Sequence, residues 1–384
     1  MRYGWLMILC VVGGPIPSLA DDSVAKLLDD LKAVQTEGPA SPTARAAWEK
    51  LVERGPAALP AILTAMDTPD TVLANWLRTA FDLIVERELA AGGGRIDVAA
   101  LLRVVEDPRR RGRVRRLALD VVERLRPGTR DRLTPGWLDD PEFRYEAVAL
   151  LLKEGDGFAE KGDKEQAVAR YRKAWSASRD VGQVQALANR LKQHGHSVSL
   201  AEHLGFLTEW YVIGPFEANG KGFATSYPPE KAIDLNAELP GKEGPVRWQR
   251  YQVKETTTGL PARVALVNLL EPLGAADDAV AYAYTAFQVV HAQEVEFRGA
   301  ADDNFIVWVN GQRVFAFEEY RNGVRLDRHR FRVKLQPGVN QVLVKICQAP
   351  PDPSGTTEPN WEFLLRVVDD TGKGIARKSV LPPP

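Results

Sequence analysis

Two carboxylate pairs, Asp277-Asp278 and Asp302-Asp303, are the first candidates for chemistry in this sequence. Hydrolysis of a glycosidic bond requires two carboxyl groups held on either side of the scissile bond. Adjacent strand residues point to opposite faces, and adjacent turn residues commonly cap or fold the backbone. We therefore interpret both pairs as turn residues, although Asp302, Asp303 or Asp277 could also supply oxygen ligands to a structural Ca²⁺.

The stretch ADDNFIVWVNGQRVFAF, residues 301–317, is the second candidate, because Asn310-Gly311 predicts a two-residue hairpin turn. Strict alternation places Trp308 opposite Arg313 and makes both faces of the hairpin apolar. One predicted face holds Phe305, Val307, Val309, Val314 and Ala316, and the other holds Ile306, Trp308, Phe315 and Phe317. The sequence does not decide what covers the second face. Three covers are possible: an opposing sheet, the helical half of the chain, or a sugar ring stacked on Trp308 with Arg313 bonding its hydroxyls.

Other catalytic signatures are absent from the sequence. It has no Gly-x-Ser-x-Gly elbow and no His-Glu-x-x-His, and "GPFEANGKG" departs from a phosphate loop in length and in having Gly222 for Ser or Thr. His194, His196 and His203 lie close together, but we interpret them as residues of a solvated linker. We predict no catalytic residue and no cofactor, so that an enzyme is the less favoured class.

The run RRRGRVRR contains six arginines: Arg109, Arg110, Arg111, Arg113, Arg115 and Arg116. An anionic polysaccharide, lipopolysaccharide or an acidic protein could bind such a run. The simpler interpretation is a solvated helix start with Glu106, Asp107 and Asp120 as counter-charges. The formal net charge of −1 gives no general attraction to polyanions, and we predict no nucleic-acid partner.

The first residues predict a secretory signal peptide, residues 1–20. A basic Met1-Arg2 precedes a short apolar run, and Ser18-Leu19-Ala20 supplies the small residues of a cleavage site. The apolar run is too short to span a bilayer, so we expect a secreted or periplasmic protein that does not cross the membrane. Of the two cysteines, only Cys347 lies beyond this segment, which leaves no pair for an intramolecular disulfide.

The periodicity of apolar residues changes along the chain and predicts two parts. Residues 21–198 show the helical period and are rich in Ala, Leu, Arg and Glu, whereas residues 206–384 show period two with more Gly, Pro and aromatic residues. The segment between Gly195 and Gly205 is the predicted linker. Its Val198, Leu200 and Leu204 favour docking of the two parts over free motion.

Segments of the first part repeat one another. ALPAILTAMDTPDTVLANWLRTAFDLIVER aligns with DVAALLRVVEDPRRRGRVRRLALDVVERL, and Pro69, Pro108 and Pro141 occupy the same place, where each should open a second helix. These copies resemble HEAT-like repeats over residues 42–153. Six residues that follow resemble one tetratricopeptide repeat: Leu151, Gly155, Phe158, Ala167, Tyr171 and Ala174. Helix pairs of this kind must stack to bury their apolar stripes, so we expect an α-solenoid.

The second part contains about nine short strands separated by turn residues, among them ARVALVNLL over residues 262–270, which predicts an antiparallel β-sandwich. DDNFIVWVNGQRVF, FRVKLQPGVNQVLVKI and NWEFLLRVV resemble the jelly-roll sugar-binding domain of family 2 glycosidases and, more broadly, galactose-binding-like modules. The resemblance lies in strand and turn positions and implies a fold without implying a ligand. No catalytic barrel follows these strands in the sequence.

These patterns together predict a secreted, non-catalytic adapter. We expect the sandwich to contact carbohydrate and the helical repeats to contact a protein of the cell envelope. Trp308, Arg313, Asp302 and Asp303 are the candidate ligand-binding residues. Two alternatives stay open: a glycoside hydrolase or lyase, or an accessory subunit of one, and a purely structural envelope scaffold.

Overall fold

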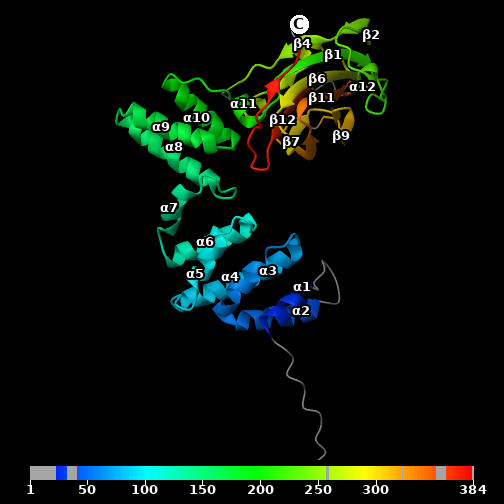
Figure 1. The fold of residues 1–384 in the computed structure, drawn as a ribbon. Helices are drawn as coiled ribbons and strands as arrows, with labels where there is room; N and C mark the ends of the chain where they lie inside the picture. The colour runs from blue at the N-terminus through cyan, green and yellow to red at the C-terminus, as the bar shows by residue number, and fades with distance from the viewer. Residues whose placement is uncertain (1–22, 33–40, 257–258, 322, 352–359, 383–384) are drawn as a thin grey trace, which may run out of the picture. The chain divides into compact units, whose positions relative to one another are not determined.

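The computed structural model describes residues 23–32, 41–256, 259–321, 323–351 and 360–382, and the predicted signal peptide lies outside them. The chain divides into two compact units, Met1–Gly136 and Trp137–Pro384. The first unit is helical, and the second begins with helices and continues into antiparallel sheets (Figure 1). Among the described helices, none is both long enough and apolar enough to cross a membrane.

The described residues of the first unit form mainly helices. Their bounds are α1 Val24–Lys32, α2 Ser41–Glu53, α3 Leu59–Ala65, α4 Thr71–Ala90, α5 Val98–Glu106, α6 Gly112–Leu125 and α7 Thr129–Leu133. The turns between α3 and α4 and between α5 and α6 contain Pro69 and Pro108, as the repeat predicted. Neither proline opens the next helix, however. Asp70 caps α4, accepting hydrogen bonds from the amides of Val72 and Leu73, and α6 begins only at Gly112, after Arg111.

The second unit opens with α8 Arg144–Glu160, α9 Lys164–Ala177, α10 Val181–Gln193 and the short α11 Leu200–Leu204. Gly155 lets α8 approach α9 closely, since a β-carbon there would lie 2.4 Å from Cε1 of Tyr171. The Tyr171 hydroxyl donates to Asp156 at 2.7 Å, and Arg190 of α10 donates to the same carboxylate at 2.6 Å. One carboxylate therefore connects three helices.

The strands of the second unit form two large antiparallel sheets and one small hairpin, β2 Glu238–Pro240 with β3 Pro245–Arg247. The seven-stranded sheet has the order β4-β1-β6-β11-β8-β9, with β13 also paired to β6, and the four-stranded sheet has the order β10-β7-β12-β5. The strand bounds are β1 Glu209–Glu217, β4 Gln249–Gln252, β5 Val267–Asn268, β6 Ala279–Val289, β7 Gln293–Ala301, β8 Phe305–Val309, β9 Gln312–Phe317, β10 His329–Leu335, β11 Gly338–Gln348, β12 Glu362–Val368 and β13 Lys378–Ser379.

One large hydrophobic core joins the two sheets and the preceding helices. Val344 of β11 and Phe297 of β7 both belong to it, and so do Val184 of α10 and Leu204 of α11. Arg366 of β12 donates to the Leu204 carbonyl at 3.2 Å, so α11 lies against the four-stranded sheet. The predicted linker is thus partly helical and packed against this sheet, and residues of α10 and α11 share a core with the strands.

The hairpin of residues 305–317 has the predicted turn but a different register. Asn310 and Gly311 both have positive φ, 52° and 78°, and Trp308 pairs with Arg313. Val307 then pairs with Phe315, which leaves Val314 as a bulge. The prediction that Phe315 and Phe317 share the face of Trp308 is therefore wrong: the extra residue turns both rings to the side of Phe305, where Phe305 and Phe315 lie 5.2 Å apart.

Another predicted strand, ARVALVNLL over residues 262–270, exists only as the two-residue β5. A short 3-10 turn, Pro261–Arg263, precedes it, and α13 Leu270–Leu273 follows. Val264, Ala265, Val267 and Leu269 are all buried, so burial explains their apolar character without an extended strand. A short apolar sequence does not by itself distinguish a strand from a buried irregular segment.

Candidate functional site

The second face of the hairpin belongs to the outer face of the seven-stranded sheet, which is covered by the chain's own segments. Tyr282 and Tyr284 of β6 and Leu343 and Cys347 of β11 point to this face and form a second core. Five side chains between residues 218 and 248 pack over it, together with two from the C-terminal end: Phe223, Ile233, Leu235, Leu239, Val246, Val380 and Leu381. We call residues 218–248 the covering segment.

Lys345 anchors the covering segment to the sheet. This lysine lies in the middle of β11, is 1% exposed, and donates to the carbonyls of Phe223 and Thr225 at 3.3 and 2.6 Å. It also forms an ion pair with Glu230 at 3.0 Å, and its ammonium lies 5.1 Å from the ring centre of Tyr227. A buried ammonium requires such partners because desolvation alone would be very costly.

Tyr282 completes this anchor, and Cys347 lies on the same face of the sheet in the second core. The Tyr282 hydroxyl donates to Glu230, and burial, followed by this carboxylate, raises the pKa of Tyr282 far above its ordinary value. Burial raises the pKa of the Cys347 thiol to about 12, which keeps it protonated and unreactive at neutral pH. The group therefore holds a segment in place and does not supply a nucleophile.

The covering segment leaves part of the face open beside Trp308. There a hollow of about 550 Å³ is bounded by residues of the covering segment, of three sheet strands and of the C-terminal end. Its lining includes Pro229, Glu230, Ile233, Tyr284, Trp308, Gln341, Leu343 and Val380. Trp308 is half-buried at the edge of the second core, so one part of its ring packs on protein and another faces the hollow. We call this the Trp308 hollow.

The other predicted ligand-binding residues do not gather around Trp308. Arg313 is exposed and pairs with Trp308 in register, but it does not line the hollow. Asp303 is buried, and its two carboxylate oxygens accept from the backbone amides of Arg321 and Ala349 at 2.5 and 2.6 Å. Asp303 therefore fixes the loop after β9, with one backbone amide on each of its carboxylate oxygens.

Asp302 has a different environment from Asp303. Burial, and then the nearby carboxylates of Asp303 and Glu362, raise the pKa of Asp302 to about 6. A hydrogen bond from the Gly323 amide and the charge of Arg263 act in the opposite direction. Within the described residues, no group of three or more His, Cys, Asp or Glu side chains could hold a metal ion. The pKa of Asp302 thus lies closer to neutral pH than that of an ordinary carboxylate.

A larger groove lies where α9 and α11 meet the sheets. It has a volume of about 880 Å³, and we call it the junction groove. Trp175, Glu202, His203, His291 and Asp369 are among its lining residues. The ring of Trp175 packs on that of His203, with centres 4.3 Å apart, and His203 Nε2 bonds the Ser178 carbonyl at 2.9 Å. Burial, followed by the charges of Arg179 and Lys373, lowers the pKa of His203.

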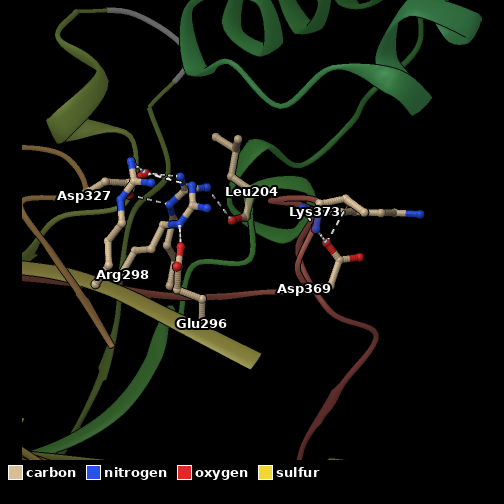
Figure 2. A network of polar contacts seen from close by, with 9 residues as sticks. Leu204, Glu296, Arg298, Asp327, Asp369 and Lys373 are labelled. Carbon is tan, nitrogen blue, oxygen red and sulfur yellow. Dashed lines mark hydrogen bonds and ion pairs between the residues drawn. The ribbon is translucent and has the colours of Figure 1, made fainter. Parts of the chain in front are cut away.

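A network of charges joins β7 and β12 to the loop before β10, close to Leu204 of α11 (Figure 2). Asp327 accepts from Nε of Arg366 at 2.7 Å and from Arg298 at 3.2 Å, and Arg298 also bonds Glu296 at 2.5 Å. Burial raises the pKa of Asp327, but Arg366 and Arg298 outweigh burial, so its pKa lies below the ordinary value. In the adjacent loop, one oxygen of Asp369 accepts from the Lys373 amide, and the Lys373 ammonium points away from that carboxylate.

A third hollow lies between α8 and α10. It has a volume of about 650 Å³, and its lining includes Tyr145, Leu152, Lys153, Asp180 and Gln183. Tyr145 is 56% exposed, which is unusual for a large aromatic side chain in this molecule. The hollow thus presents an open aromatic ring beside charges of both signs.

The arginine run and the histidine group have structural partners. Arg115 is buried and donates to the Val105 carbonyl at 2.8 Å, while Arg113 bonds the Met66 carbonyl at 3.2 Å. Arg109 pairs with Asp107, and Arg111 with Asp67. His196 contacts Arg172, while His194 lies near the Tyr171 ring. Asp107 is a counter-charge as predicted, but the prediction of a solvated helix start is wrong for Arg115, which is buried. The interpretation of the histidines as residues of a solvated linker is wrong for His203, which lies in α11 and packs on Trp175.

The anchor at Lys345 and the junction groove were not predicted from the sequence. A signal for the anchor exists, since Lys345 lies within VLVKIC and interrupts a strand that is otherwise apolar on both faces. No comparable signal marks the groove, because its residues come from four separate segments of the chain. Spacing along one segment cannot reveal such a site.

No family model and no curated protein matches the sequence. Among solved structures, an anti-sigma factor domain-containing protein is 13% identical at a TM-score of 0.21, covering 29% of this chain and 39% of that one. A Faecalibacterium prausnitzii β-glucuronidase is 12% identical at a TM-score of 0.23, and the match covers 43% of this chain and 31% of that one. A GH31 α-xylosidase from Xanthomonas citri is 13% identical at a TM-score of 0.19, and the match covers 43% of this chain and 17% of that one. This chain spans well under half of each, and likenesses at these scores carry no argument about function.

Proposed function

We propose that this protein is a secreted, non-catalytic binding protein whose sheets bind carbohydrate in the Trp308 hollow and whose helices contact a protein. The two sheets would then act as a galactose-binding-like sandwich, and the helical part as a solenoid of stacked pairs. The Trp308 hollow supports this proposal most directly. It combines a half-buried tryptophan with apolar Leu343 and polar Gln341 and Glu230.

These residue types suit a sugar ring. The apolar face of a pyranose packs on an aromatic ring, and a few well-placed polar groups then fix its orientation. Trp308 is held from one side by the second core, so little side-chain freedom would be lost on binding. A single carboxylate, Glu230, lines this hollow, and it is engaged by Lys345 and Tyr282. Hydrolysis requires two carboxyl groups, so the hollow favours binding without catalysis.

A glycan array with the full chain, followed by titration of the best ligand, tests the proposal. We expect Trp308→Ala to weaken binding by about 1–3 kcal/mol, by analogy with aromatic stacking on other flat ligands. Trp175→Ala is the matched control, because it removes the same side chain from the junction groove. Equal binding by wild type and Trp308→Ala would refute the proposal, and no binding to any glycan would favour a purely structural scaffold.

Hydrolysis in the junction groove is the second candidate function. Glu202 and Asp369 both line this groove together with Trp175, which is the combination of two carboxylates and an aromatic platform that a glycosidase uses. One Asp369 oxygen is already occupied by Thr371 and Lys373, which weakens this candidate. Release of reducing sugar that disappears in both Glu202→Gln and Asp369→Asn would establish it over the binding function.

The hollow between α8 and α10 supports the proposed protein contact. An exposed Tyr145 beside Lys153 and Asp180 offers both an apolar anchor and charges to a partner. Crosslinking of the full chain to a partner, compared between wild type and Tyr145→Ala, tests whether the partner contacts this hollow. Equal crosslinking of the same partner at exposed positions elsewhere on the chain would count against this role.

A further inference from the structure

Strand β10 is an edge strand with a regular row of positive charges. It pairs with β7 from His329↔Gly299 to Leu335↔Gln293, and it is the last strand of its sheet. Among the described residues, no backbone hydrogen bond joins β10 to any strand except β7. The rings of Phe315 and Phe317 in β9 contact Phe331 and His329 of β10 on the core side, but they leave the second edge of β10 without a backbone partner. Its backbone groups can therefore accept another strand.

The side chains of β10 alternate between two environments. Val333 and Leu335 are buried in the large core, and Phe331 stacks on Phe297 with ring centres 5.7 Å apart. Arg330, Arg332 and Lys334 alternate with them and are exposed. Successive cations are separated by two residues, roughly 7 Å along a strand. The core fixes the strand, so the row of charges has a defined spacing.

These cations are only partly neutralised by the rest of the sheet. Arg330 is 55% exposed and lies 4.0 Å from Asp327, which Arg366 and Arg298 already engage. Arg332 faces Glu296 in register, but that carboxylate bonds Arg298 at 2.5 Å. Lys334 faces the exposed Glu294. The charge that remains along β10 is positive.

We propose that β10 binds an acidic, extended segment of a partner protein, which adds to the sheet as a further strand. In such a strand, acidic residues at every second position repeat with the same spacing as the three cations and lie opposite them. The row of charges also selects against a second copy of this chain, because antiparallel pairing of β10 with itself places cations opposite cations. This surface is independent of the Trp308 hollow and its sugar.

The probe for this proposal is a labelled hexapeptide, acetyl-Glu-Thr-Glu-Thr-Glu-Thr-amide, titrated into the full chain by fluorescence anisotropy. We expect Arg332→Glu/Lys334→Glu to weaken binding about tenfold or more, since two attractive cross-strand pairs become repulsive. The control Lys254→Glu/Lys378→Glu makes the same change in net charge at exposed positions outside β10 and should bind like wild type.

Two N-methylated peptides distinguish strand addition from attraction between charges alone. One carries methyl groups on its glutamate amides and the other on its threonine amides, so only one of them blocks the hydrogen bonds that face β10. Loss of binding by one peptide, with retention by the other, supports the proposal. Equal binding by all three peptides, or equal weakening by the control variant, overturns it.

Discussion

Replacing Lys345 by Met tests the central structural claim, that one buried cation holds the covering segment on the sheet. The methionine keeps most of the stem volume but removes the ammonium. Its loss leaves the carbonyls of Phe223 and Thr225 without their donor and leaves Glu230 without its cation. Breaking a buried ion pair from one side typically costs about 3–5 kcal/mol. Glu230 is 16% exposed and can regain some water, so we expect about 3 kcal/mol.

Urea denaturation of the full chain, monitored by tryptophan fluorescence, measures this cost. Lys378→Met is the control, because Lys378 is exposed and its loss should change the free energy of unfolding by no more than about 0.5 kcal/mol. The double variant Lys345→Met/Glu230→Gln should recover part of the loss, since it also removes the unpaired carboxylate. A cost below about 1 kcal/mol for Lys345→Met would show that other contacts hold the segment.

The same variant connects the anchor to the proposed function. Pro229, Glu230 and Ile233 form one wall of the Trp308 hollow, so release of the covering segment should weaken glycan binding although Trp308 is unchanged. If Lys345→Met lowered stability but left the affinity for glycan intact, the sugar would bind without contact to this wall.

Three further outcomes can be measured. Gly155→Ala should cost about 1–3 kcal/mol, because its β-carbon would lie 2.4 Å from Tyr171, whereas Gly157→Ala, with open space around it inside α8, should stabilise the protein by about 0.5–1 kcal/mol in thermal denaturation. The pKa of Asp302 is raised from 3.8 to about 6, so ionisation costs stability as pH rises through this window, and Asp302→Asn should gain about 1 kcal/mol at pH 8 but little at pH 4. The pKa of His203 is lowered from 6.5, so the unfolded chain binds more protons and stability falls as pH drops below 6.5; His203→Gln should reduce this loss in denaturation at pH 7 and 5.

Local chemistry explains what the sequence could predict. The change of apolar period near residue 200 separates helices from strands because it reflects which faces are buried. The turn at Asn310-Gly311 was predictable because two consecutive positive φ angles favour these residues. Leu200 and Leu204 indicated a packed linker, and both are buried in the large core.

The bulge at Val314 could not be predicted from the sequence, because no special residue type marks it. Its consequence is nevertheless large, since one extra residue moves Phe315 and Phe317 from one side of the hairpin to the other. Phe317 then lies 4.2 Å from the His329 ring, between the edges of the two sheets. Such a shift is decided by contacts between segments that are distant in the sequence.

The cover of the hairpin's second face was unpredictable for a related reason. Sequence analysis considered an opposing sheet, the helical half and a sugar, but the face is covered mainly by residues 218–248, whose apolar side chains follow no regular period. Much of this segment lies outside helices and strands, so it can hold this position only if its polar backbone is satisfied, and Lys345 supplies donors to two of its carbonyls.

The position of this lysine also determines the extent of the cover. Lys345 bonds Glu230, which also accepts from the Tyr282 hydroxyl of β6. Trp308 belongs to β8, which is separated from β6 by β11. The segment therefore shields the middle of the face and leaves its edge open at Trp308. A tryptophan held by protein on one side and open on the other is better suited to a ligand than to a closed core. The incomplete cover is thus the physical reason to propose a ligand beside Trp308.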